Sequence, residues 1–227
     1  MIKLSVIIPC FNQADTVIKI IKSLDSIPKI IEKEIILVDD GSSNDCKIFL
    51  RNRLVDKVTV LAFHKTRSGR IAVLRTGLSQ ATGEIILLLD FGTIYQSEDY
   101  LNLIKPIIDC NAEVVWVPYA YKTNSSPVGS YRTFLWNRFL TGFSNFLCNL
   151  NLSHFRAGGI LFHKKFFCKV TIKDEKSILE PQLLSLMAES KSRIFEVNPH
   201  HKNLPASLSK KEAINAFYSM VKHNLFW

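Results

Sequence analysis

Short apolar runs rich in isoleucine and valine recur along the first 120 residues of the chain. They occupy residues 4–9, 34–38, 58–63, 84–89 and 112–117. The apolar residues within each run are nearly continuous rather than alternating, which is typical of parallel strands buried on both faces of a sheet. We therefore predict five strands of a mostly parallel sheet in this part of the chain.

Segments with helical periodicity lie between these runs. The first has apolar residues at intervals of three and four positions, namely Val17, Ile20, Ile21 and Leu24. A second helix is predicted over residues 71–80, and a third begins after Ser97. Strands that alternate with helices predict an α/β fold, a central sheet flanked by helices. Ligands of such folds bind outside the carboxyl ends of the strands.

The second half of the chain has a different pattern. Residues 131–150 are crowded with aromatic and leucine side chains, and Arg132 and Arg138 lie among them. A glycine pair at 158–159 and a basic run at 164–165 follow. The segment 209–212 has the pattern of a capping box and predicts a final helix. Because no internal repeat or linker separates the halves, we predict one domain over residues 1–227.

The charge of the chain indicates an anionic partner. Lys and Arg number 29 against 20 acidic residues, which gives a net charge of +9. Such an excess favours a nucleotide, a phospholipid surface or a nucleic acid as partner. Zinc-finger spacing, an RNA-binding aromatic motif and a glycine-lysine phosphate loop do not occur in the sequence, so we expect no nucleic acid.

The cysteines and the length of the apolar runs indicate where in the cell the protein is expected. The five cysteines are scattered and contain no C-x-x-C pair, which favours reduced thiols over a disulfide framework or a zinc site. The first apolar run is too short for a signal sequence, and no stretch reaches the roughly 18 apolar residues that cross a bilayer. We expect a cytoplasmic protein, either soluble or peripheral at the inner face of the membrane.

Three motifs follow one another at the predicted strand ends. They are SVIIPCFN at residues 5–12, IILVDDGSSND at residues 35–45, and a segment at residues 68–90 that ends in LLLD. Together they resemble the inverting glycosyltransferases of family 2, which have the GT-A fold, and in particular the polyprenyl- and dolichyl-phosphate sugar synthases. The resemblance covers residues 1–105, and it implies a Rossmann-like nucleotide-diphospho-sugar transferase that moves a hexosyl group.

The resemblance assigns donor binding to residues 1–105. Asp40, with Asp39 beside it, would accept the ring N–H of the base, and the loop that follows the first strand would lie against the base. Basic side chains would face the diphosphate. The implied donor is a UDP- or GDP-linked sugar. The nucleotide-binding candidates are Pro9, Phe11, Asn12, Asp39, Asp40, Lys65 and Arg70.

Asp90 is the candidate catalytic and metal-binding residue. A buried strand that delivers one carboxylate to the edge of a sheet indicates a functional site, because burying a charge without a purpose is costly. In the family this Asp begins an Asp-x-Asp pair that holds Mg²⁺ or Mn²⁺ across the diphosphate, but here Gly92 stands at the third position. Three alternatives follow: Asp90 and the diphosphate hold the metal, basic side chains replace it, or catalysis is lost.

The acceptor part, residues 106–227, also departs from the family pattern. The family places an Asp shortly before a Gly-Phe-Arg-like segment, whereas residues 153–159 read SHFRAGG. An alcohol acceptor needs a general base, but a phosphate is already an anion. The expected acceptor is a polyprenyl phosphate or a growing cell-surface glycan. Candidate phosphate contacts are Arg132, Arg156 and Lys202.

Other features leave alternatives open. His200 and His201 are a metal-ligand pair or surface residues of a polar loop, and Glu180 has family precedent for facing the site. The aromatic residues at 131–150 either pack against the sheet or lie on an anionic membrane. A competing hypothesis is a catalytically impaired relative that binds a nucleotide or a partner protein. A nucleotidyltransferase would have a glycine-rich basic loop after the first strand, where this chain has PCFN.

Overall fold

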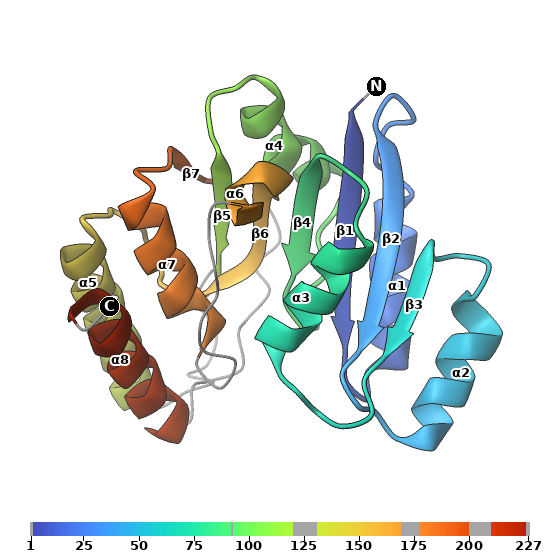
Figure 1. Cartoon of the computed structure of the whole chain (residues 1–227), viewed down its shortest axis with the longest axis horizontal. Helices are drawn as coiled ribbons and strands as arrows, with labels where there is room; N and C mark the ends of the chain where they lie inside the picture. The colour runs from blue at the N-terminus through green and yellow to red at the C-terminus, as the bar shows by residue number, and fades with distance from the viewer. Residues whose placement is uncertain (1, 92, 120–130, 169–177, 200–209, 226–227) are drawn as a thin grey trace.

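The structure, a computed structural model, describes residues 2–91, 93–119, 131–168, 178–199 and 210–225. Seven strands of this part of the chain form one sheet in the order β3-β2-β1-β4-β6-β5-β7 (Figure 1). The strands are β1 (Lys3–Cys10), β2 (Glu32–Asp39), β3 (Val60–Phe63), β4 (Ile85–Leu89), β5 (Val114–Pro118), β6 (Ala157–His163) and β7 (Ile194–Glu196).

The first four strands are parallel, as the continuous apolar runs predict. Ile7 in β1 pairs with Ile36 on one side and with Leu88 on the other, and all three side chains are buried. At the end of the strands, Cys10 pairs with Asp39, and Asp39 pairs with Phe63. The carboxyl ends of β1, β2 and β3 therefore meet at one edge, where β4 also ends and Asp90 follows it.

The fifth predicted strand forms β5, but it is not a neighbour of β4. β6, which the sequence pattern did not predict, lies between β4 and β5 and is antiparallel to both. Its glycine pair allows close packing: a Cβ atom at Gly159 would lie 2.6 Å from the hydroxyl oxygen of the buried Tyr95. The second half of the chain thus contributes a strand to the middle of the sheet.

Helices cover both faces of the sheet. Helix α1 (Ala14–Leu24) buries Val17, Ile20, Ile21 and Leu24, which confirms the predicted apolar face. It shares one core cluster with α2 (Asn44–Leu54) and α4 (Ser97–Ile108). The cluster on the other face includes residues of α3 (Arg70–Gln80), α5 (Tyr131–Cys148), α7 (Leu179–Glu189) and α8 (Lys210–Leu225). Figure 1 shows α3 in front of the sheet, α1 behind it, and α5 beside α8.

A buried carboxylate holds the opposite edge of the sheet. Glu34 of β2 accepts hydrogen bonds from the Ser5 hydroxyl at 2.5 Å, the Thr82 N–H at 2.6 Å and the Gly83 N–H at 3.0 Å. Burial raises the pKa of Glu34, but these hydrogen bonds outweigh that effect and hold the pKa below its ordinary value. Glu34 therefore ties β1 and β2 to the turn before β4 as a carboxylate.

A short helix, α6 (Lys164–Cys168), follows β6. Among the helices of the described residues, none combines the length and the apolar character that crossing a membrane requires.

Candidate active site

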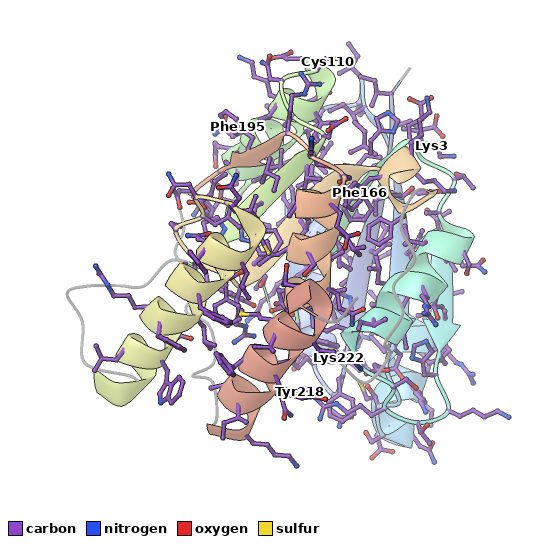
Figure 2. The ribbon with its side chains drawn as sticks, turned by 60° about the vertical axis from the view of Figure 1, so that its left-hand side comes forward. Lys3, Cys110, Phe166, Phe195, Tyr218 and Lys222 are labelled. Atoms are coloured by element: carbon purple, nitrogen blue, oxygen red, sulfur yellow. The ribbon has the colours of Figure 1, made fainter. Side chains whose placement is uncertain are left out.

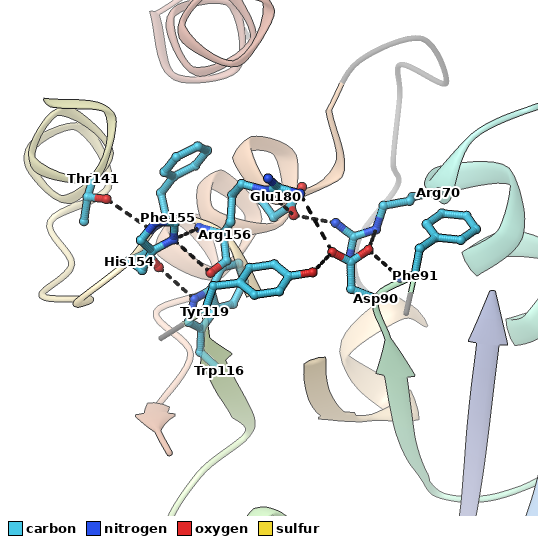
Figure 3. Close-up of polar contacts among 10 residues, drawn as sticks. All are labelled: Arg70, Asp90, Phe91, Trp116, Tyr119, Thr141, His154, Phe155, Arg156 and Glu180. Carbon is cyan, nitrogen blue, oxygen red and sulfur yellow. Dashed lines mark hydrogen bonds and ion pairs between the residues drawn. The ribbon is translucent and has the colours of Figure 1, made fainter. Parts of the chain in front are cut away.

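Asp90 follows β4 directly and is 4% exposed. Its Oδ1 atom accepts the N–H of Phe91 at 2.8 Å and lies 3.1 Å from Nε of Arg70. Its Oδ2 atom accepts the hydroxyl of Tyr119 and lies 3.9 Å from a terminal nitrogen of Arg156. Figure 3 shows these side chains converging on the carboxylate. The strand therefore delivers Asp90 to the carboxyl edge of the sheet, where the sequence predicts it, and the structure surrounds it there with a polar cluster.

Arg70 and Glu180 form the second half of this cluster. Arg70 is the first residue of α3 and Glu180 the second residue of α7, and the guanidinium donates to the carboxylate of Glu180. Burial alone would lower the pKa of Arg70, but the carboxylates of Asp90 and Glu180 raise it above its ordinary value. Arg70 is thus held between two carboxylates at the carboxyl edge of the sheet.

Glu180 is 1% exposed and ionised. Burial raises its pKa, but Arg70 and Arg156 outweigh burial and hold the pKa below its ordinary value. Arg156 Nε lies 3.9 Å from the same carboxylate. Two arginines and two carboxylates therefore form one network, which we call the Arg–carboxylate network: Arg70, Asp90, Arg156 and Glu180.

Tyr119 was not predicted as a site residue. It follows β5, and its buried ring lies 5.3 Å from the guanidinium carbon of Arg156. Burial and the neighbouring Asp90 raise the pKa of Tyr119 above its ordinary value, so the phenol stays protonated and donates to the carboxylate. The signal that singled out Asp90, a polar side chain just after a buried strand, also marks Tyr119.

His154 fixes the backbone that carries Arg156. The N–H of Arg156 donates to Nδ1 of His154 at 3.0 Å, and Trp116 Nε1 donates to the His154 carbonyl at 3.0 Å (Figure 3). Burial lowers the pKa of His154 to about 4. The imidazole is therefore neutral near pH 7 and can accept the N–H that positions Arg156.

Asp40 lies wholly inside the protein and shapes the loop that precedes α3. Its carboxylate accepts the N–H groups of Ser68 and Gly69, each at 2.9 Å, and contacts Nδ1 of His64 at 2.8 Å. Gly41 has φ +81°, and a Cβ atom there would lie 2.5 Å from the Thr66 carbonyl carbon. The structure gives Asp40 a positioning role, and its contact with a nucleotide base stays a prediction.

Asp39 and Asn12 hold the turn between β2 and α2. Asp39 accepts the N–H of Ser42 at 3.1 Å and also its hydroxyl. The N–H of Asn12 donates to Ser42 Oγ at 2.8 Å, and Asn12 Oδ1 accepts the N–H of Ser43 at 2.9 Å. These contacts bring the loop after β1 and the Asp-Asp-Gly-Ser turn together.

The remaining donor candidates lie around this turn. Pro9 is buried in β1, while Lys65 is exposed in the loop after β3. Phe11 is half-buried, and the guanidinium carbon of Arg67 lies 4.3 Å from the centre of its ring. An aromatic face with a cation above it suits a base and its phosphates.

Some predicted site residues cannot be placed. Gly92, His200, His201 and Lys202 lie outside the described residues, and the Arg132 side chain does too, although its backbone belongs to α5. A different group of potential ligands is described: Cys10, Asp39 and Cys46 have ligand atoms within 4.8 Å of one another. The scattered sequence positions of the two cysteines gave no sign of this proximity.

Comparison with known proteins identifies the family. The family model described as "Glycosyl transferase family 2" matches residues 5–171. A GalNAc(5)-diNAcBac-PP-undecaprenol beta-1,3-glucosyltransferase of Campylobacter jejuni is 37% identical over 92 residues, 40% of this chain and 29% of that protein. An undecaprenyl-phosphate 4-deoxy-4-formamido-L-arabinose transferase of Klebsiella pneumoniae is 32% identical over 107 residues, 45% of this chain and 33% of that protein. The chain matches about a third or less of the length of these curated relatives.

Solved structures share the fold. The glucosyl-3-phosphoglycerate synthase of Mycobacterium tuberculosis, in complex with Mg²⁺ and UDP, aligns with a TM-score of 0.71 at 16% identity, over 98% of this chain and 79% of that chain. The same enzyme with Mn²⁺ and UDP-glucose aligns with a TM-score of 0.70. Since the family model matches more than half of the 227 residues, the chain belongs to glycosyl transferase family 2 and has the GT-A fold.

Proposed function

We propose that this protein is a glycosyltransferase that moves a hexosyl group, with inversion, from a UDP- or GDP-linked donor to a phosphate-bearing acceptor. The observation that carries the proposal is the position of Asp90, Arg70 and Arg156 at the carboxyl edge of the sheet of a family 2 chain. Ligands of open α/β sheets bind at this edge. Cationic side chains there suit the charge that develops on a departing diphosphate.

The donor half comprises residues 1–105. In the proposal, the base lies beside Phe11 and the Asp39-Asp40 turn, and the diphosphate lies toward Arg70, with Lys65 nearby. The structures of the M. tuberculosis enzyme with UDP and UDP-glucose support a uridine donor by analogy. GDP stays the alternative.

The acceptor proposed is a lipid phosphate bound by residues 106–227, and a growing glycan is the alternative. Arg156 belongs to the predicted acceptor part of the chain and reaches the Arg–carboxylate network. In the proposal its guanidinium also contacts the acceptor phosphate. His154, two residues before Arg156, is buried, and its Nδ1 atom accepts the backbone N–H of Arg156. In the proposal it positions Arg156 and does not contact the acceptor. The names of the Klebsiella and Campylobacter relatives refer to undecaprenyl-linked substrates, which supports this class of acceptor.

An exposed aromatic surface on α5 and α8 supports a membrane-bound acceptor. Trp136 is 46% exposed and Phe139 is 50% exposed, and the Phe139 ring lies 6.0 Å from that of Phe217 on α8. We call this surface, formed by Trp136, Phe139, Phe143 and Phe217, the α5–α8 surface; Figure 2 labels Tyr218 and Lys222 on the same helix, α8.

The occupant proposed for the α5–α8 surface is an anionic membrane. Arg138 on α5 and Lys211 on α8 are exposed, and the whole chain carries a charge of +9. Exposed aromatic rings beside cations are typical of a surface that binds at the headgroup level of anionic lipids. The protein would then act as a peripheral protein at the cytoplasmic face of the membrane.

Nucleotide binding tests the enzymatic proposal. Isothermal titration calorimetry with UDP and with GDP should give dissociation constants in the micromolar range, roughly −6 to −8 kcal/mol. Mass spectrometry should then detect a glycosylated polyprenyl phosphate after incubation with the matching nucleotide sugar. Failure of both nucleotides to bind would leave only the fold in common with the enzymes of the family.

Vesicle binding tests the proposed acceptor surface. Sedimentation with phosphatidylglycerol vesicles should decrease with added salt and with Phe139→Glu. The matched control is Ile48→Glu: Ile48 is 55% exposed on α2, which lies at the opposite end of the molecule (Figure 1). Equal sedimentation of both variants, or transfer to a soluble sugar without vesicle binding, would overturn the membrane-bound acceptor.

The second candidate function is nucleotide or partner binding without transfer. It is favoured by Gly92, which removes one family carboxylate, and by the enclosure of the Asp90 carboxylate among Arg70, Tyr119 and Arg156. Nucleotide binding without any product, across UDP and GDP sugars and lipid-phosphate acceptors, would favour this candidate.

A further inference from the structure

The described residues around Asp90 do not fit a divalent cation. Both carboxylate oxygens are already engaged by donors or cations, from Arg70, the Phe91 N–H, Tyr119 and Arg156. Mg²⁺ requires close to six oxygen ligands in near-ideal geometry. Within the described part of the chain, the one group of three or more potential metal ligands is Cys10, Asp39 and Cys46, which does not include Asp90.

The second carboxylate of the network is also neutralised by protein. Glu180 contacts the same two arginines as Asp90, so the network holds two positive and two negative charges. A metal bound at either carboxylate would lie beside two guanidinium groups, and their like charge would oppose its binding. The guanidinium groups of Arg70 and Arg156 thus occupy the position beside Asp90 and Glu180 that a divalent cation would take.

Arg70 has a donor that its protein partners leave unused. Its Nε faces Asp90 and one terminal nitrogen faces Glu180, but the other terminal nitrogen, Nη2, is buried and has no hydrogen-bond partner among the described residues. A buried donor without an acceptor costs free energy, so an acceptor oxygen at this position would be stabilising. Phosphate oxygens are strong acceptors for guanidinium N–H groups, and the Nη2 group can donate to one of them.

We propose that Arg70 and Arg156 take the place of the divalent cation, so that sugar transfer by this protein is independent of metal. This inference rests on the proposed function. Asp90 and Glu180 are positioning residues in it, because they hold the two guanidinium groups rather than a metal.

In the reaction, the bond between the anomeric carbon and the diphosphate oxygen breaks, and its electron pair stays on that oxygen. The acceptor phosphate oxygen forms the new bond on the opposite face of the sugar. Arg70 and Arg156 stabilise the charge that accumulates on the diphosphate. Because the acceptor is an anion, no proton has to be removed.

The test is calorimetric titration of metal-stripped protein with UDP and GDP, in EDTA and then in excess Mn²⁺. We expect the dissociation constant of the bound nucleotide to change less than about threefold between these conditions, since guanidinium contacts do not need the metal. Product formation should likewise continue in EDTA. Binding or transfer that requires Mn²⁺ would overturn this inference while the proposed function stood, whereas absence of all nucleotide binding would overturn both.

Variants separate a phosphate contact from a structural role. Arg70→Gln should weaken nucleotide binding about tenfold or more in EDTA. Arg75→Gln, a variant of an exposed arginine on the same helix, should leave binding unchanged. Arg70→Lys keeps the positive charge between Asp90 and Glu180, so it is the control for a loss of folding in Arg70→Gln. It should bind nucleotide with an affinity between those of wild type and Arg70→Gln. Gly92→Asp should introduce Mn²⁺ dependence into the binding. Equal nucleotide binding by folded Arg70→Gln and by wild type would overturn the role of Arg70.

Discussion

Arg70 donates to Glu180 across 110 positions of sequence and joins the start of α3 to the start of α7. The same guanidinium contacts Asp90 at the end of β4. The link therefore connects the first half of the chain to the second half at the carboxyl edge of the sheet. A contact that is buried and charged on both sides has consequences for stability as well as for ligand binding.

Glu180→Gln should destabilise the protein by about 3 kcal/mol, because it leaves two largely buried guanidinium groups with Asp90 as the one remaining carboxylate of the Arg–carboxylate network. Urea unfolding at neutral pH measures the loss. The double variant Arg70→Met/Glu180→Met should cost less than Glu180→Gln alone, since apolar replacement removes both charges together. A double variant that is less stable than Glu180→Gln would contradict this coupling.

Glu34→Ala should cost about 3 kcal/mol of unfolding free energy, because the N–H groups of Thr82 and Gly83 would lose their buried acceptor. Glu34→Gln is the matched control: its amide oxygen keeps the acceptor for both N–H groups, so we expect a smaller loss. Urea titrations of the three proteins, run side by side, make the comparison. Equal losses in both variants would assign the effect to side-chain packing.

The same carboxylate predicts a pH dependence. The folded pKa of Glu34 lies below its ordinary value of 4.5, so its contribution to stability is fully present above about pH 4.5 and is lost as the pH falls through the folded pKa. The difference in unfolding free energy between wild type and Glu34→Gln should therefore shrink below about pH 4.5. A constant difference down to pH 3 would contradict the lowered pKa.

The lowered pKa of His154 predicts that the unfolding free energy also depends on pH above the range in which Glu34 titrates. Its folded pKa of about 4 lies below the ordinary 6.5, so only the unfolded state takes up this proton as the pH falls below 6.5. Unfolding free energy should fall by up to about 1.4 kcal/mol per pH unit between pH 6.5 and 4 from this residue alone. His154→Asn keeps an acceptor for the Arg156 N–H but does not titrate. Identical pH slopes for both proteins would contradict the prediction.

The Tyr95 side chain packs so closely against Gly159 that a side chain at position 159 would clash with it. The Tyr95 hydroxyl is buried without a hydrogen-bond partner among the described residues, so Tyr95→Phe should be neutral or stabilising. Gly159→Ala should cost about 1–3 kcal/mol, because its Cβ would lie 2.6 Å from that hydroxyl oxygen.

The double variant Tyr95→Phe/Gly159→Ala should recover part of the loss, since the phenyl ring lacks the clashing oxygen. Thermal or urea unfolding of the three variants reports the recovery. A double variant no more stable than Gly159→Ala would place the clash at the ring carbons instead, the nearest of which would lie 3.2 Å from the alanine Cβ atom.

The sequence by itself determined the local elements of the first half of the chain. The strands β1 to β4, the buried face of α1 and the carboxylates at the strand ends follow from residue spacing, because periodicity and strand burial are properties of neighbouring positions. The position of Asp90 at the edge of the sheet follows from the same argument, since the end of a buried parallel strand is itself a local feature.

Tertiary structure alone decided how the second half completes the site. The insertion of β6 between β4 and β5, and the meeting of Arg70, Tyr119, Arg156 and Glu180 around Asp90, join residues from five elements or their ends. Asp40, which follows β2, likewise holds the loop before α3 from inside the protein. Such contacts depend on which segments pack side by side, and sequence spacing carries no record of a partner that lies 110 positions away.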